Sequence, residues 1–225
     1  SFSKEFFNKK FKQLDLKNYY HENYELENLS GLKDLINKNN LSGINITTPY
    51  KEKILNHLDI IDNTAKKIGS VNTIKILNNK LVGFNTDIIG FEKSILFAIK
   101  NRKNALILGD GGASKAVQYV FKKNNIKITI VSRKSNRNYN NLTKEDIINN
   151  LIIINTTTLG MYPDIKSYPK IPYEYLNKNH LVYDLVYNPK KTKFLEKAEK
   201  QGSHIINGYQ MLKKQANEAW KIWQN

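Results

Sequence analysis

The chain has 225 residues, of which 40% are hydrophobic, no cysteine, and a formal net charge of +16. This length suits one large domain or two smaller ones with real cores, and the lack of cysteine excludes disulfides and thiolate metal sites. We find no apolar run long enough to span a bilayer and no signal peptide, so we expect a cytoplasmic protein without a membrane partner. The charge makes nucleic acid worth weighing as a partner. The basic residues, however, are mainly dispersed lysines without an arginine-rich run, so we expect no nucleic-acid partner and a solvated basic surface instead.

Hydrophobic periodicity predicts an alternation of helices and strands in the first hundred residues. In chain order we expect a helix over 4–14 capped by Ser3, an aromatic strand over 19–26, a helix over 30–39, a strand over 42–46, a helix from Pro49 to Lys67 broken near Asp59, a hairpin of strands over 70–77 and 80–87, and a helix over 88–100. This order is typical of an α/β fold.

A strand, a glycine cluster and a helix start follow without a gap in Ala105-Leu-Ile-Leu-Gly-Asp-Gly-Gly-Ala-Ser-Lys-Ala-Val117. Glycines let the backbone approach a ligand closely, and the free N–H groups and dipole of the new helix attract a phosphate. The pattern favours a dinucleotide site, although an ordinary strand-to-helix turn also fits it.

The strand expected over 127–133 carries information about the cofactor. In an NAD site such a strand ends in an acidic residue that binds the ribose 2′-hydroxyl. Here it ends in Ser132-Arg133, with Lys134 and Arg137 close behind. Guanidinium groups suit the additional 2′-phosphate of NADP, so the sequence favours NADP, with a plain basic surface loop as the alternative.

The remaining chain continues the alternation. We expect a capped helix over 143–150, a strand over 151–155, a strand over 180–189, a helix over 192–201, a strand over 204–207, and a final helix from Gly208 whose apolar stripe contains the polar Gln215. Gln215 therefore needs a hydrogen-bonding partner.

Three polar residues stand near strand ends in the first half of the chain: Lys51, Asn72 and Asp87. Loops at strand ends are where α/β folds bind ligands, so these side chains could share one crevice. Taken singly, Lys51 also fits a surface lysine in a first helical turn, and Asp87 also fits a helix cap.

Eight signatures in order make the chain similar to the shikimate and quinate dehydrogenase family. They are Ser1-x-Ser3, Asn45-Ile-Thr-Thr-Pro-Tyr-Lys51, Val71-Asn-Thr73, Asn85-Thr-Asp87, the turn from Gly109 to Ser114, Asn155-Thr-Thr-Thr-Leu-Gly-Met161, Asp184-Leu-Val-Tyr-Asn-Pro189 and Gly208-Tyr-Gln-Met-Leu-Lys-Lys-Gln-Ala216. The resemblance implies reversible NADPH-dependent reduction of 3-dehydroshikimate to shikimate, a step of aromatic amino-acid biosynthesis.

The resemblance also assigns roles to residues. Lys51 and Asp87 match the catalytic pair. The substrate is expected to contact Ser1, Ser3, Thr47, Asn72, Asp87, Tyr187 and Gln215, and NADP to contact Gly109, Asp110, Gly111, Gly112, Ala113, Ser114, Ser132, Arg133, Lys134, Arg137, Thr156, Leu185 and Gly208. No metal is required, because the hydride carrier supplies the difficult chemistry.

The chain departs from the family pattern in two residues of the cofactor loops. Asp110 replaces a common alanine in the glycine turn, and Lys134 replaces a common threonine. An acid beside a pyrophosphate lowers cofactor affinity unless its side chain points away. The family also has a strand and a glycine turn before the paired serines, so we expect those residues to precede Ser1 in the natural protein.

We therefore predict two domains with the active site in the cleft between them. Residues 1–86, joined by the terminal helix 208–225, form an α/β substrate-binding domain, and residues 87–207 form a Rossmann-type NADP-binding domain. We expect a monomer or homodimer. The rival interpretations are the same fold acting on quinate or with NAD, a non-catalytic NADP-binding or regulatory protein, and a basic nucleic-acid binder.

Overall fold

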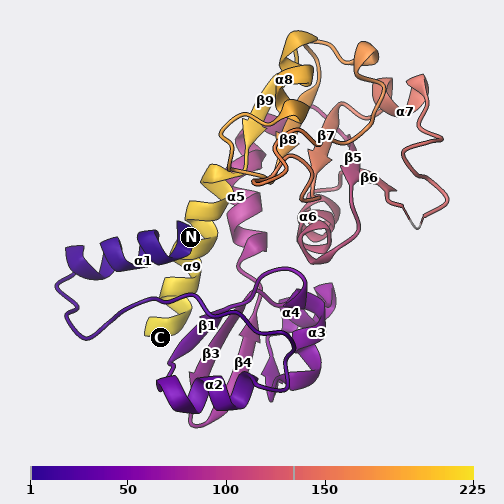
Figure 1. Ribbon diagram of the computed structural model, residues 1–225. Helices are drawn as coiled ribbons and strands as arrows, with labels where there is room; N and C mark the ends of the chain where they lie inside the picture. Colours follow the sequence, from indigo (N-terminus) through magenta and orange to yellow (C-terminus); the bar gives the residue numbers. More distant parts are fainter. Residues whose placement is uncertain (1, 134) are drawn as a thin grey trace. The chain divides into compact units, whose positions relative to one another are not determined.

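The computed structural model describes residues 2–133 and 135–225, and the chain divides into two compact units. One unit ends at Leu41, and the other spans Ser42–Asn225. The second unit contains a four-stranded and a five-stranded sheet with helices, which confirms the predicted α/β class (Figure 1). Within the described residues, every helix is too short or too polar to cross a bilayer.

The first unit contains helices α1 (Phe2–Gln13) and α2 (Leu32–Asn39). Ser3 lies inside α1 and does not cap it. The strand expected over 19–26 is wrong, because this segment has no ladder partner among the described residues. Instead, the Asn8 side chain accepts a hydrogen bond from the backbone N–H of His21 (2.8 Å) and donates one to its carbonyl (3.2 Å). One side chain thus satisfies the backbone groups that a neighbouring strand would have paired.

The smaller sheet has the strand order β1-β3-β4-β2. Its strands are β1 (Gly43–Asn45), β2 (Ile60–Ile61), β3 (Thr73–Leu77) and β4 (Lys80–Phe84). The predicted hairpin is confirmed: β3 and β4 pair antiparallel, and Asn78 and Asn79 turn between them with positive φ angles of 49° and 59°. Asparagine tolerates this left-handed conformation better than most residues, which explains the Asn-Asn pair.

The single broken helix expected from Pro49 to Lys67 is wrong, because the segment forms four short elements. They are α3 (Tyr50–Lys53), a 3₁₀ helix η1 (Ile54–His57), β2 and α4 (Asn63–Ile68). Asp59 exchanges hydrogen bonds with Leu81, its N–H donating to the Leu81 carbonyl and its carboxylate accepting from the Leu81 N–H. This contact places Ile60–Ile61 parallel to Val82–Gly83 in β4, and Asp62 then caps α4.

The larger sheet is entirely parallel, with the strand order β6-β5-β7-β8-β9, as a Rossmann-type fold requires. The strands are β5 (Asn104–Leu108), β6 (Lys127–Val131), β7 (Ile152–Asn155), β8 (Leu181–Asp184) and β9 (His204–Asn207). The helices around it are α5 (Asp87–Ile99), α6 (Gly112–Lys123), α7 (Lys144–Ile148) and α8 (Lys193–Lys200), with a 3₁₀ turn η2 (Tyr173–Tyr175).

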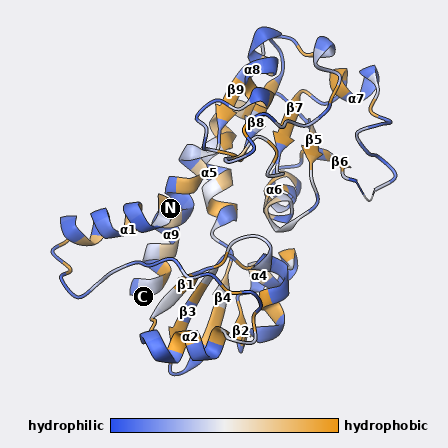
Figure 2. Cartoon of the chain, viewed as in Figure 1, coloured by the Kyte–Doolittle hydropathy of each residue, from blue (hydrophilic) through white to orange (hydrophobic). Residues whose placement is uncertain are grey.

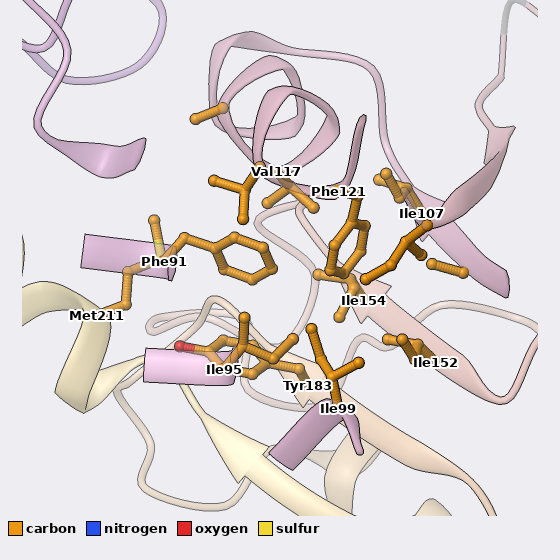
Figure 3. Packing of buried hydrophobic residues seen from close by; sticks show 14 of the residues in the cluster. Phe91, Ile95, Ile99, Ile107, Val117, Phe121, Ile152, Ile154, Tyr183 and Met211 are labelled. Carbon is orange, nitrogen blue, oxygen red and sulfur yellow. The ribbon is translucent and has the colours of Figure 1, made fainter. Parts of the chain in front are cut away.

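Two hydrophobic clusters cover the two faces of this sheet. Alternate strand residues pack against α5 and α6 on one face, for example Ile107 and Ile154, and against α7 and α8 on the other, for example Leu106 and Ile153. Figure 3 shows the first cluster, in which Tyr183 lies among the aromatic and aliphatic side chains of α5 and α6. The central strands β5, β7 and β8 are correspondingly mostly hydrophobic in Figure 2. A sheet buried on both faces explains why its strands were predictable as continuous apolar runs.

The final helix α9 (Tyr209–Gln224) packs along α5 and also reaches the smaller sheet (Figure 1). The two helices approach closely at Gly90, where an added Cβ would lie 2.8 Å from the Met211 carbonyl oxygen. Near its end, the Trp223 indole covers Gly43 and donates a hydrogen bond to the Ile74 carbonyl at 2.9 Å. Helix α9 therefore contacts both α5 and the strands that precede the site.

Candidate active site

Lys51 and Asp87 form a largely buried ion pair. Lys51 is the second residue of α3, and Asp87 is the first residue of α5, where the helix N-terminus favours a carboxylate. The Lys51 Nζ lies 2.7 Å from Asp87 Oδ2, and the two side chains are only 17% and 7% exposed. The structure thus brings together the two residues that the sequence placed in separate loops.

Asn72 and Gln215 lie beside this pair in one polar network. Asn72 Oδ1 accepts a hydrogen bond from the Thr86 N–H at 2.7 Å, and the Thr86 hydroxyl donates to Gln215 Oε1 at 3.2 Å. The Asn72 amide is also within 3.5 Å of Gln215 Oε1. Gln215, on the apolar stripe of α9, therefore has the partner that its position required. Thr86 was missed as a site residue although it stands inside the Asn85-Thr-Asp87 signature.

The other predicted substrate residues come from other parts of the chain. Thr47 is exposed in the loop between β1 and α3, where the neighbouring Ile46 N–H donates to the Asn72 carbonyl at 2.8 Å. Tyr187 lies half-buried in the loop between β8 and α8. Ser3 lies in α1 of the unit that ends at Leu41, and Ser1 lies outside the described residues.

The glycine turn joins β5 to α6 as predicted. Gly109 has a φ of 111°, a conformation that favours glycine, and an added Cβ would lie 2.6 Å from the Thr156 hydroxyl. The Ser114 hydroxyl donates to the Gly109 carbonyl at 2.8 Å, which closes the turn, and Ala113 follows at the start of the helix. No described atom lies within 4 Å of a Cβ at Gly111, so this position faces open space.

The opposite situation holds at Gly112. An added Cβ there would lie 2.8 Å from the Ser70 hydroxyl, 3.1 Å from Lys51 Cβ and 3.6 Å from Lys51 Cδ. The first turn of α6 is therefore in contact with the side-chain stem of Lys51. This contact places the ion pair next to the helix start that the sequence assigned to phosphate binding.

Asp110 is exposed, and its charge, like that of Arg133, acts on the hydroxyl of Tyr139. Burial raises the pKa of the Tyr139 hydroxyl to about 12, while the charge of Arg133 lowers it and that of Asp110 raises it. The Tyr139 hydroxyl is buried and has no hydrogen-bond partner among the described atoms.

The basic loop after β6 is folded on itself. Ser132 is buried and its N–H donates to the Arg137 carbonyl, whereas Arg133 and Arg137 are exposed. The Arg137 Nη1 lies 3.2 Å from Asp146 Oδ2, and Asp146 completes the capping box of α7 with Thr143. Lys134 lies outside the described residues. Arg137 is thus oriented by a helix cap, a contact that the sequence did not indicate.

Thr156, Leu185 and Gly208 directly follow the carboxyl ends of β7, β8 and β9. The Thr156 hydroxyl donates to the Leu108 carbonyl at 2.7 Å, and the Leu185 N–H donates to the Asn155 carbonyl at 3.0 Å. A Cβ at Gly208 would lie only 2.0 Å from the Leu185 carbonyl oxygen, so only glycine fits there.

Asp184, at the end of β8, holds these loops together. Its carboxylate accepts hydrogen bonds from Asn155 Nδ2 (2.9 Å), the Val186 N–H (3.0 Å) and the Thr192 hydroxyl (2.5 Å), and the residue is fully buried. Burial raises the pKa of Asp184 to about 6, and the three donated hydrogen bonds only partly oppose this.

The raised pKa of Asp184 predicts a pH-dependent stability. Because the folded protein binds the Asp184 proton more tightly than the unfolded chain, this group stabilises the fold below a pH of about 4, and the contribution is lost as the pH rises to about 6. A shift of this size corresponds to about 3 kcal/mol. Urea unfolding across this range should show the free energy of unfolding of the natural chain falling relative to that of Asp184→Asn, then running parallel to it above pH ~6. A constant difference at all pH values would contradict the assignment.

Within the described residues, no group of three His, Asp or Glu side chains could hold a metal ion.

The chain is similar to known proteins of one family. A family model described as the shikimate dehydrogenase substrate binding domain matches residues 1–74. A shikimate dehydrogenase (NADP(+)) from Methanococcus aeolicus is 41% identical to the chain, over 96% of this chain and 84% of that protein. The chain belongs to the shikimate dehydrogenase family. Another family member, from Staphylococcus aureus, is 39% identical over 96% of this chain and 85% of its own length.

Solved structures of the family have the same fold. The shikimate dehydrogenase of Aquifex aeolicus matches 99% of this chain and 87% of its own with a TM-score of 0.88 and 36% identity. The Thermus thermophilus enzyme, solved in complex with NADP(H) and shikimate, matches 99% of this chain and 88% of its own with a TM-score of 0.85 and 30% identity. The family resemblance predicted from the eight signatures is therefore confirmed.

Proposed function

We propose that this chain catalyses the reversible NADPH-dependent reduction of 3-dehydroshikimate to shikimate, a step in the biosynthesis of aromatic amino acids. One observation carries the proposal: the Lys51–Asp87 ion pair lies against the first turn of α6, the helix whose N-terminus follows the glycine turn. An acid–base pair is thus in contact with a phosphate-binding element, as hydride transfer between a nicotinamide and a substrate requires.

The residues of the glycine turn fit an NADP molecule. Gly111 faces open space, so a pyrophosphate can approach the backbone, and the free N–H groups of α6 favour its charge. The guanidinium groups of Arg133 and Arg137 stand on the neighbouring loop, where they suit a 2′-phosphate. Asp110 is exposed and the neighbouring loop carries Arg133, so we propose that this cation offsets the charge of the Asp110 carboxylate.

The chemistry of the reduction depends on Lys51. When bound, the reduced nicotinamide supplies a hydride to the ketone carbon, which leaves negative charge on the ketone oxygen. A fixed ammonium group beside that oxygen stabilises the transition state more than the ground state. The Lys51 ammonium can also donate its proton to the oxygen, and the neutral amine can take it back in the oxidation direction. Asp87 holds the ammonium at 2.7 Å and offers its other oxygen to a substrate hydroxyl.

The neighbouring network would bind the remaining polar groups of the substrate. The amides of Asn72 and Gln215 are linked through Thr86, so their orientations are fixed before the substrate arrives. We include Thr47, Tyr187, Ser1 and Ser3 in the substrate site on the family resemblance alone.

We also propose the domain division, location and assembly predicted from the sequence. Residues 1–86 with the terminal helix form the substrate domain, and residues 87–207 the NADP domain; the contact of Trp223 with Gly43 and Ile74 supports the inclusion of α9. A monomer or homodimer in the cytoplasm completes the proposal.

The direct test is shikimate-dependent formation of reduced nicotinamide, followed by absorbance. The natural full-length protein should reduce NADP⁺ with shikimate, and much more slowly with quinate or with NAD⁺ as the replacement. Absence of shikimate-dependent turnover would refute the enzyme assignment, and faster turnover with quinate or NAD⁺ would reassign the substrate or the cofactor.

Cofactor preference should depend on Arg133. We expect Arg133→Ala to raise the KM for NADP⁺ by about 10- to 100-fold, because a charge-assisted hydrogen bond to a phosphate contributes about 1.5–3 kcal/mol. The KM for NAD⁺, which lacks this phosphate, should not change. Lys127→Ala serves as the matched control, because Lys127 is exposed at the start of β6, the strand that leads to Arg133. Equal losses with both cofactors would remove Arg133 from the 2′-phosphate site.

A further inference from the structure

An ion pair joins the cofactor-binding helix to the residue next to Lys51. Lys115 lies in the first turn of α6, and its Nζ contacts the Glu52 carboxylate on α3. Both side chains are partly exposed, at 33% and 43%. The two residues are 63 positions apart in the chain, so this pair is a tertiary contact between α3 and α6.

Helix α3 is too short to hold its position by itself. It has only four residues, and a helix of one turn is not stable by itself. None of its residues is buried, and its N-cap makes no side-chain hydrogen bond. The backbone is tied at the Lys51 carbonyl, which accepts a hydrogen bond from the Val71 N–H at 2.8 Å. The direction of the Lys51 side chain therefore depends on what packs against it.

Helix α6 provides a rigid support. It has twelve residues, and its buried side chains, among them Ala116, Val117 and Val120, belong to the main hydrophobic cluster. Its first turn contacts α3 at two residues: Gly112 packs against the Lys51 stem, and Lys115 pairs with the adjacent Glu52. The two contacts lie one helical turn apart on α6 and involve consecutive residues of α3.

We propose that Lys115 and Glu52 are positioning residues that hold the Lys51 ammonium at the reacting oxygen from the cofactor side. This inference rests on the proposed function, since it assigns the pair a purpose in that reaction. A partly exposed ion pair contributes little to folding stability, because solvent screens it. A small misplacement of a catalytic group, in contrast, reduces turnover strongly. The pair should therefore affect kcat much more than thermal stability.

Kinetic measurements on five variants test the proposal. Lys115→Met keeps the stem and removes the charge, and Glu52→Gln removes the partner; each should lower kcat for shikimate oxidation by about tenfold, while the KM for NADP⁺ stays within about twofold. The double variant should be no slower than either single variant, because both changes remove one interaction. Lys115→Arg, which retains the charge, should keep most of the turnover. Lys123→Met is the matched control, because Lys123 lies at the other end of the same helix. Its Nζ pairs with the Glu92 carboxylate at 2.8 Å.

Hydrogen exchange provides a readout that does not need turnover. Amide protons of residues 50–53 should exchange faster in Lys115→Met than in the natural chain. Their exchange rates should be unchanged in Lys115→Arg and Lys123→Met. The proposal is overturned if Lys115→Met matches Lys123→Met in both kcat and exchange, or if the two single changes multiply in the double variant. If the natural chain has no turnover, the proposed function fails, and the exchange rates alone then decide whether the pair positions α3.

Discussion

Replacing Lys51 by methionine should lower kcat for shikimate oxidation by about 10³-fold, while shikimate still binds. The change removes the ammonium group that stabilises and protonates the ketone oxygen, and the two effects together account for a loss of this order. Methionine is preferable to alanine, because its longer side chain also fills the position of Lys51 Cδ near Gly112, which an alanine would leave empty. Steady-state kinetics gives the loss, and calorimetric titration with shikimate in the presence of NADP⁺ shows whether binding persists.

The control for this change lies two residues further along the same helix. Lys53 is exposed on α3, so Lys53→Met removes an equal charge from the same element without touching the site. Its kcat should stay near that of the natural chain. Near-normal turnover of Lys51→Met would remove Lys51 from the catalytic role, and an equal loss in Lys53→Met would mean that the net charge of the helix, and not one ammonium, is responsible.

The sequence predicted the larger sheet well because burial leaves a clear signal. A strand covered on both faces must be apolar where it is covered, as Ile152 to Ile154 are in β7. The helix starts at Thr143 and Thr192 were readable for the same local reason, since each hydroxyl accepts a hydrogen bond from an N–H within its own turn.

The prediction failed where a distant contact determines the local structure. Ile60–Ile61 looks helical on its own, and it becomes a strand because Asp59 bonds Leu81 across the sheet. Residues 19–26 look like a strand by composition, and Asn8 of α1 binds the backbone of His21 in this segment instead. In both cases tertiary contacts override local propensity.

The site shows the same division. The motifs located Lys51, Asp87 and the glycine turn, because their positions follow strand ends. They carried no information on the ion pair between Lys115 and Glu52, or on the contact of Gly112 with the Lys51 stem. Such contacts depend on how the two sheets are set against each other, a property of packing that no local spacing encodes.

Gly112 should therefore be the glycine of the turn that controls turnover. In Gly112→Ala the new methyl group would lie 2.8 Å from the Ser70 hydroxyl and 3.1 Å from Lys51 Cβ, so one of them must move. Ser70 is fully buried, which leaves the Lys51 stem as the part that yields. We expect kcat to fall by about 10²-fold, because a displacement of about 1 Å in a catalytic group has this effect. Steady-state kinetics at saturating NADP⁺ measures this loss.

Gly111→Ala separates this effect from cofactor binding. Gly111 has an extended backbone (φ −78°, ψ −174°) and no described atom within 4 Å of its added Cβ, so the fold and Lys51 should be undisturbed. Because the methyl group occupies the space proposed for the pyrophosphate, the KM for NADP⁺ should rise by about tenfold with kcat nearly unchanged. Adding Ser70→Gly to Gly112→Ala should restore part of kcat by removing the nearest obstacle. If both glycine variants lose only cofactor affinity, the first turn of α6 holds phosphate alone and does not set the position of Lys51.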